Sequence, residues 1–166
     1  LSAPVVFKPV DSSGSKGVIV VKEDSLDLWK NAFHQAIEHS FSKQVCIESF
    51  VPGDDISGDG FIKDGYLWAM TTEKYSRGTI PIGHRVPGIL SKEQEIAVLR
   101  EVAENCRKCG YTEGPIDFDV RVNGKNVVVL EMSPRLGGNC IPEIINMCSG
   151  VDLVAVSYTH LRAHET

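Results

Sequence analysis

The stretch GPIDFDVRVNGKNVVVLEMSPRLGGN, residues 114–139, decides the fold of this chain. Hydrophobic and polar residues alternate on both sides of Asn123-Gly124, a dipeptide typical of tight hairpin turns. We therefore predict two antiparallel strands, over residues 116–122 and 125–132. Side chains two positions apart on a strand point to the same face, so the polar residues of each strand fall into fixed groups.

The first predicted strand carries Asp117, Asp119 and Arg121 on one face, and the second carries Val127, Val129 and Glu131 on one face. A two-residue Asn123-Gly124 turn would send Asp119 and Glu131 to opposite sides of the sheet. A three-residue turn over residues 122–124, with glycine in the left-handed region as a G1 bulge, would bring them together.

Two carboxylates that converge on one face repel each other and favour a hard divalent cation, which we expect to be Mg²⁺. The alternative is an ordinary polar outer face on which Arg121 is the ion-pair partner. The sequence leaves both readings open.

The remaining elements follow from periodicity and turn signals. We expect a hairpin of strands at residues 4–10 and 18–21, a helix at 25–41, a strand at 45–51, two strands within 55–75, and a helix between Ser91 and Gly110. Residues 77–90 hold five Gly or Pro and predict a loop. These elements predict an α+β fold with a largely antiparallel sheet and packed helices.

Composition excludes several classes of protein. The net charge of −5, without a cluster of basic residues, argues against a nucleic-acid partner. No apolar run reaches the roughly 18 residues that a membrane span needs. The five cysteines are odd in number and lack paired spacing, which favours the cytoplasm.

Two short motifs suggest ligand chemistry. The loop DSSGSKG, residues 11–17, has the glycines and hydroxyls that bind phosphate, although P-loop spacing is absent and a solvated hairpin tip is the alternative. The run from Asp55 to Gly60 resembles the start of an EF-hand, but its twelfth position is Tyr66, so we reject calcium. We expect Ser57 and Asp59 to be solvated turn residues.

Beyond the second strand of the hairpin, residues 133–139 form a loop rich in glycine and polar groups. Arg135 in this loop has the planar fork that binds phosphate in a bidentate manner. A surface salt bridge is the alternative for this side chain.

Three segments in this order, VVFKPVDSSGSKGV, CIESFVPGDD and GPIDFDVRVNGKNVVVLEMSPRLGGN, resemble the ATP-grasp superfamily over roughly residues 1–155. The loop after the last strand is most similar to the carbamoyl-phosphate-synthase-like and biotin-carboxylase-like branch. The resemblance implies that ATP and Mg²⁺ are the cofactors. It also implies the residues that bind the nucleotide. Lys8 would contact the α/β-phosphates, and Asp55 would contact the ribose. Glu48 with the backbone of Ser49 and Val51 would bind the adenine.

The resemblance further implies a lid over the phosphates and a metal site. The lid would consist of Ser12, Ser13, Gly14, Ser15, Lys16 and Gly17. Asp119 and Glu131 would bind Mg²⁺, and Arg135 would lie near the transferred phosphoryl group.

The resemblance implies a ligase that forms an acylphosphate from a small-molecule carboxylate and then joins it to an amine or similar nucleophile. Ser133 stands where many members have a metal-binding Asn, and Ser133 or Asn139 is the expected substitute. A non-catalytic nucleotide-binding module is therefore the alternative. His84 is a candidate for facing the acceptor substrate.

The two ends of the chain carry separate expectations. The subdomain that precedes VVFKPV in the family is absent, so we expect this chain alone to bind ATP poorly and to be inactive. VSYTHLRAHET, residues 156–166, resembles a translated adapter used in DNA library preparation, and we expect a foreign tail. The four-residue spacing of His160 and His164 is accordingly not read as a zinc motif.

Overall fold

The computed structural model describes residues 1–78 and 80–162, and they form two compact units. The first unit is Leu1–Val51 with Ser76–Pro81, and the second is Pro52–Tyr75 with the described residues from Ile82 onward. Each unit combines helices with an antiparallel sheet, so the predicted α+β class is confirmed.

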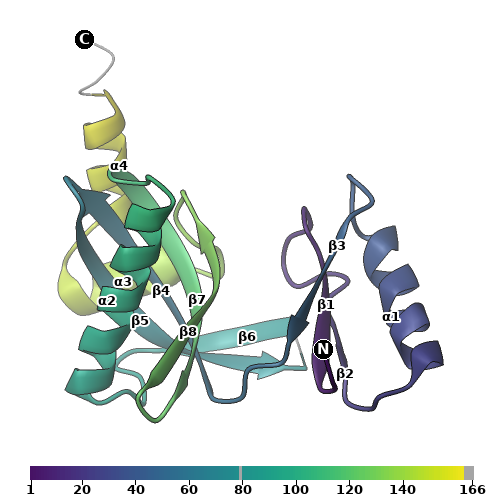
Figure 1. The fold of residues 1–166 in the computed structure, drawn as a ribbon. Coiled ribbons are helices and arrows are strands. Elements are labelled where there is room, and N and C mark those ends of the chain that lie inside the picture. The colour runs from purple at the N-terminus through teal and green to yellow at the C-terminus, as the bar shows by residue number, and fades with distance from the viewer. Residues whose placement is uncertain (79, 163–166) are drawn as a thin grey trace. The chain divides into compact units, whose positions relative to one another are not determined.

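The first unit is a three-stranded antiparallel sheet covered by one helix (Figure 1). Its elements are β1 (Val5–Pro9), β2 (Ile19–Val21), α1 (Leu26–Glu38) and β3 (Val45–Ser49), with strand order β2-β1-β3. Apolar residues of α1 and of one sheet face bury each other, and they include Val5, Phe7, Ala32 and Ala36. The expected hairpin, helix and third strand are all present.

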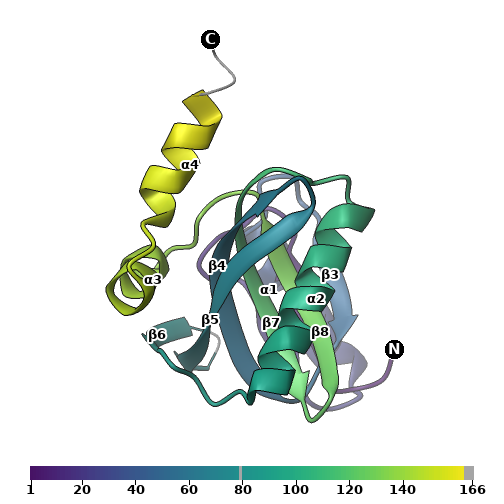
Figure 2. The same ribbon diagram turned by 90° about the vertical axis from the view of Figure 1, so that its left-hand side faces the viewer.

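The second unit is a five-stranded antiparallel sheet with helices on both sides (Figure 2). Its elements are β4 (Asp54–Lys63), β5 (Tyr66–Arg77), β6 (Ile80–Arg85), α2 (Lys92–Lys108), β7 (Gly114–Asn123), β8 (Asn126–Ser133), α3 (Ile141–Ser149) and α4 (Leu153–Arg162). The end of β5 and the start of β6 fall within Ser76–Pro81 and so belong to the first unit. The strand order is β6-β5-β4-β7-β8. α2 packs on one face of the sheet, and α3 and α4 pack against Phe61 on the other.

The start and end of α2 follow from local sequence. The Ser91 side chain accepts a hydrogen bond from the Gln94 backbone, and the Gln94 side chain accepts one from the Ser91 backbone, which completes the expected capping box. Gly110, with φ of 72°, follows the last turn in the left-handed region. Val98, Val102 and other apolar residues of α2 pack on the sheet.

The expected loop over residues 77–90 was wrong in part, because β6 occupies Ile80–Arg85. Glycine and proline are loop signals, but strand β6 is stabilised by pairing with β5, which the local sequence does not encode. Pro81 is accommodated because β6 is the edge strand of the sheet.

The described C-terminal residues form α4, which includes the start of the expected foreign tail. The ring centroid of His160 lies 5.0 Å from that of Phe61. Residues 163–166, with His164, lie outside the described residues, and the foreign origin of residues 156–166 stays a prediction. None of the described helices is both long and apolar enough to cross a membrane.

Candidate functional site

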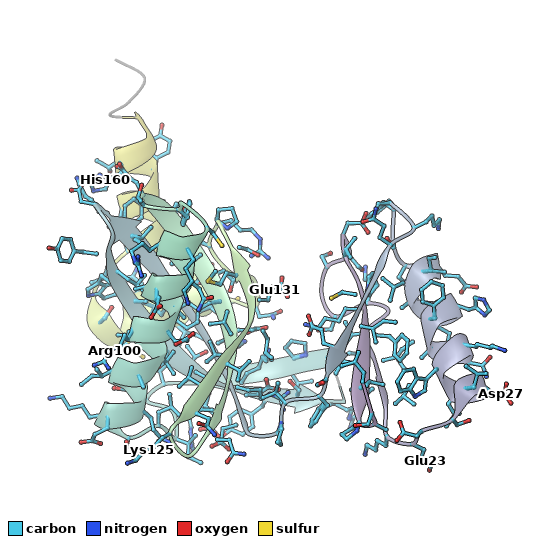
Figure 3. The ribbon with its side chains drawn as sticks, viewed as in Figure 1. Glu23, Asp27, Arg100, Lys125, Glu131 and His160 are labelled. Carbon is cyan, nitrogen blue, oxygen red and sulfur yellow. The ribbon has the colours of Figure 1, made fainter. Side chains whose placement is uncertain are left out.

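The second unit presents a polar sheet face on the side away from α2. Every second residue of β4, β5, β7 and β8 lies on this face, because the residues between them point to the other face and pack against α2. Glu131 points away from α2 in Figure 3, whereas Arg100 lies on that helix. The polar sheet face consists of Asp55, Ser57, Asp59, Thr72, Lys74, Asp117, Asp119, Arg121, Glu131 and Ser133.

Asp119 and Glu131 lie directly opposite each other in the β7–β8 ladder. Neither expected turn produces this pairing: the turn residues are Gly124 and Lys125, between the paired Asn123 and Asn126. That turn alone would place Asp119 opposite Leu130. A register shift after Asp119/Val120 makes Leu130 an extra residue, so the two carboxylates converge through a β-bulge.

The bulge also corrects the predicted faces of β8. Val127 and Val129 pack in the core under α2, and Glu131 lies on the opposite, polar face. The expectation that these three residues share one face was therefore wrong, because simple alternation ignores the extra residue. The predicted face shared by Asp117, Asp119 and Arg121 is confirmed by the β4–β7 register.

Asp119 is held by two neighbours on the polar sheet face. The Ser57 hydroxyl donates to one carboxylate oxygen, and the Lys74 ammonium lies 2.8 Å from the other. The Lys74 side chain is only 11% exposed, so water screens this pair weakly. Within residues 1–78 and 80–162, no group of three His, Cys, Asp or Glu side chains is placed to hold a metal ion. Asp119 and Glu131 are therefore two candidate metal ligands without a third side chain of these types in this part of the chain.

Arg121 makes its ion pair with Asp55 on the same face. Its Nε and Nη2 atoms lie 3.1 and 3.2 Å from the two carboxylate oxygens of Asp55, a bidentate geometry. Lys74 also lies 3.9 Å from Asp55. The expected ribose ligand thus has two cationic neighbours.

Asp59, Asp117 and the loop after β8 form a second cluster. Both oxygens of Asp59 accept from the Gly137 N–H at 3.0 Å, and Asp117 pairs with Asp59 in the β4–β7 register. Arg135 Nη1 lies 2.8 Å from Asp117 Oδ2, the salt bridge that was its alternative role. Ser57 and Asp59 are 1% and 0% exposed, so the expectation that they are solvated was wrong.

The electrostatics of this cluster are dominated by burial. Burial raises the pKa of Asp59 to about 7 by disfavouring the carboxylate, and Asp117 adds to the shift, while the Gly137 hydrogen bond opposes it. Burial also raises the pKa of Asp117, and the Arg135 charge opposes that shift. Both carboxyl groups therefore favour the protonated form more than a solvated aspartate does.

Glu131, Asp119, Ser57 and Thr72 are paired in turn across four strands of the polar sheet face. His84 on β6 contacts the last of them, Thr72. Its Nδ1 atom lies 2.8 Å from the Thr72 hydroxyl, and that hydroxyl donates to the Ser57 carbonyl at 3.4 Å. Burial lowers the pKa of His84, and the Lys74 charge lowers it further. The buried Nε2 atom lacks a hydrogen-bond partner among the described residues.

In the first unit, Lys8 and Glu48 lie on the sheet face opposite α1. Lys8 Nζ is 2.6 Å from Glu48 Oε2, and the Cys46 thiol donates to Glu48 Oε1 at 3.4 Å. Burial and the nearby Glu48 carboxylate raise the pKa of Cys46. The predicted phosphate and adenine residues are thus neighbours. Ser49 is exposed at the end of β3, and Val51 is half-buried beyond it.

The glycine-rich loop, residues 12–17, joins β1 to β2, and contacts with the segment after α1 hold it at both ends. Asp11 accepts from the Ser40 hydroxyl at 2.7 Å and from the Phe41 and Ser42 backbone N–H groups at 3.0 and 2.7 Å. At the other end, Gly17 packs so closely that an added Cβ would lie 2.7 Å from the Cβ of His39. Between these ends, Gly14, Ser15 and Lys16 lie in turns, and Ser12 and Ser13 have no regular secondary structure.

The chain belongs to the ATP-grasp family: the sequence profile of the ATP-grasp domain matches residues 1–143. It is 26% identical over 168 residues to carnosine synthase 1 of Mus musculus, covering 93% of this chain and 20% of that enzyme. The chain therefore spans about a fifth of the length of that relative.

Two solved structures have a similar fold. The L-amino acid ligase from Bacillus licheniformis matches with a TM-score of 0.77 and 21% identity, over 95% of this chain and 38% of that one. The biotin carboxylase domain of the Hydrogenobacter thermophilus 2-oxoglutarate carboxylase matches with a TM-score of 0.75 and 18% identity, over 92% and 35%. The latter structure is a complex with MgADP, and ATP-grasp ligases use ATP and Mg²⁺, the expected cofactors.

Sequence reasoning assigned no role to Lys74, Asp59 or Asp117. Two strands were expected within residues 55–75 and are present as β4 and β5, but the EF-hand-like spacing favoured a turn at Ser57 and Asp59, which lie inside β4. Nothing local to Lys74 indicates that it lies against Asp119, because the two residues are 45 positions apart.

Proposed function

We propose that this chain is the nucleotide-binding part of an ATP- and Mg²⁺-dependent ligase. In the proposed reaction, a substrate carboxylate oxygen attacks the γ-phosphorus of ATP and ADP leaves, which forms an acylphosphate. The nitrogen of an amine then attacks the acyl carbon, inorganic phosphate leaves, and the amine loses a proton. The names of the relatives, carnosine synthase and L-amino acid ligase, support a carboxylate and an amine as the substrate classes.

The observation that carries the proposal is the pair Asp119 and Glu131. Two carboxylates opposite each other on a sheet face are suitable ligands for Mg²⁺, which prefers oxygen donors and one or two carboxylates beside nucleotide phosphates. Ser133, opposite Asp117 in the ladder, would add a hydroxyl ligand. Mg²⁺ would neutralise the charge that develops on the transferred phosphoryl group.

Other residues complete the proposal. Lys8 would bind the α/β-phosphates, residues 12–17 would cover them, and Glu48 with the backbone of Ser49 and Val51 would bind the adenine. Asp55 would bind the ribose hydroxyls, and Arg135 would contact the transferred phosphoryl group. Such a site acts mainly by positioning and charge neutralisation.

Calorimetric titration with the ATP analogue AMP-PNP, with and without Mg²⁺, tests this function. We expect Mg²⁺-dependent binding that weakens at least tenfold in Glu131→Gln and in Lys8→Met. Glu104→Gln removes the same charge as Glu131→Gln but lies on α2, beyond the opposite face of the sheet, and should bind as the unmodified chain does. Equal binding by all variants would contradict the residue assignments.

The ligase reaction itself needs a separate measurement. The longest natural protein that contains this chain should release phosphate from ATP when it is given both a carboxylate and an amine. Nucleotide binding without phosphate release, over a broad set of amino acid pairs, would instead favour a non-catalytic nucleotide-binding module.

A further inference from the structure

Asp59 is a fully buried carboxyl group to which the proposed function gives no role. It is 0% exposed, and both of its oxygens accept from the Gly137 N–H at 3.0 Å. On its other side it shares a hydrogen bond with Asp117. Burying a carboxyl group is costly unless its oxygens are hydrogen-bonded, so this contact fixes where Gly137 lies.

The backbone at Gly137 packs directly on the carboxyl pair. An added Cβ there would lie 2.8 Å from Asp59 Oδ1 and 2.9 Å from Asp117 Oδ1. A side chain at this position would require the two carboxyl groups or the loop to shift. The approach of the loop to the sheet is therefore set by two carboxyl groups and the absence of a side chain.

The same pair holds Arg135, two residues earlier in the loop. Arg135 Nη1 lies 2.8 Å from Asp117 Oδ2 and 2.8 Å from the Leu136 carbonyl. Its side chain is 57% exposed, and an exposed ion pair by itself orders an arginine weakly. Asp59 holds the backbone beside Arg135, and Asp117 holds its guanidinium.

We propose that Asp59 is a positioning residue for Arg135. Through Gly137 and Asp117 it fixes residues 133–138 on the sheet and so sets the direction of the guanidinium. The functional part of this inference rests on the proposed function, in which Arg135 contacts the transferred phosphoryl group. Its structural part concerns the loop alone.

The test compares Asp59→Asn with Asp59→Leu. Asparagine accepts from Gly137 and donates to Asp117, as a protonated Asp59 does, whereas leucine has the same branching at Cγ and no polar group. We expect Asp59→Leu to speed amide hydrogen exchange at Gly137 at least tenfold and to increase the ¹⁵N-detected motion of the Arg135 Nε–H group. Asp59→Asn should leave both within about twofold of the unmodified chain.

Nucleotide affinity supplies the second readout. Asp59→Leu should weaken Mg²⁺–AMP-PNP binding, Asp59→Asn should restore it, and Asp59→Leu combined with Arg135→Met should bind no more weakly than Arg135→Met alone. Unchanged Gly137 exchange in Asp59→Leu, or additive losses in the double variant, would overturn the proposal. If Asp59→Leu fails to fold, Gly137→Ala, whose added methyl group crowds the Asp59 and Asp117 carboxyl groups, should increase Arg135 motion.

The two proposals fail separately. Exchange at Gly137 and motion at Arg135 are measured without nucleotide, so they decide the structural part even if the unmodified chain binds no AMP-PNP. A failure of the longest natural protein that contains this chain to bind AMP-PNP would count against the proposed function. Rapid Gly137 exchange in the unmodified chain would count against the positioning role.

Discussion

Glu131 lies directly opposite Asp119 because β8 contains one extra residue, Leu130, between Val129 and Glu131. Without this bulge, the observed turn would place the two carboxylates on opposite faces of the sheet. A single backbone irregularity thus allows β8 to pack the half-buried Val127 and Val129 against the core under α2 while presenting a carboxylate on the polar sheet face.

Asp59 makes the stability of the chain depend on pH. Its folded-state pKa of about 7 lies above the usual 3.8, so the folded chain binds the proton more tightly than the unfolded chain. This stability is fully present below about pH 4 and is lost as the pH rises toward 7. Asp117, whose pKa is also raised, adds a contribution of the same sign.

We therefore expect the urea midpoint of Asp59→Asn to change less between pH 4 and pH 7 than that of the unmodified chain, because asparagine does not titrate. Asp64→Asn, at an exposed turn position with φ of 52°, is the matched control and should keep the original slope. Parallel pH profiles for the unmodified chain and Asp59→Asn would contradict this prediction.

Much of the fold was predictable because its signals are local. The capping box of Ser91 and Gln94, the stop at Gly110 and the alternation around Phe118 depend on neighbouring residues, and all three are observed. β6 was missed because its stability comes from pairing with β5, and its one proline and one glycine resemble a loop.

The candidate site was predictable only in part. The convergence of Asp119 and Glu131 was one of two open alternatives, and its cause, the bulge at Leu130, has no signal in a pattern of four consecutive apolar residues. Lys74 and Asp59 acquire their surroundings from strands distant in sequence, so only the folded sheet places them beside Asp119 and Gly137.

Asp11 ties the glycine-rich loop to the segment after α1. Hydrogen bonds from Ser40 and Ser42 lower its pKa to about 2. Its contribution to stability is present above about pH 4 and is lost as the pH falls through 2. Asp11→Ala should speed amide exchange at Phe41 and Ser42 at neutral pH, measured by NMR. Glu23→Gln, an exposed change in the same unit, should not, and equal exchange in both variants would refute the anchoring role.

Gly17 and Gly14 in the same loop differ in the space around them. Both have positive φ, of 77° and 63°, but an added Cβ meets His39 and Pro9 at Gly17 and nothing within 4 Å at Gly14. Gly14→Ala should cost about 1 kcal/mol, the strain of alanine in the left-handed region. Gly17→Ala should cost clearly more, as measured by urea unfolding, and equal costs would show that the loop repacks freely.

The metal assignment is tested most directly by replacing Mg²⁺ with paramagnetic Mn²⁺ in the presence of AMP-PNP. The amide NMR signals of Asp119 and Glu131 should broaden at the lowest Mn²⁺ concentrations, whereas that of Val98, under the opposite face of the sheet, should persist. Asp119→Asn with Glu131→Gln should abolish the effect. Broadening centred on other residues, or unchanged in the double variant, would contradict the assignment of Mg²⁺ to this pair.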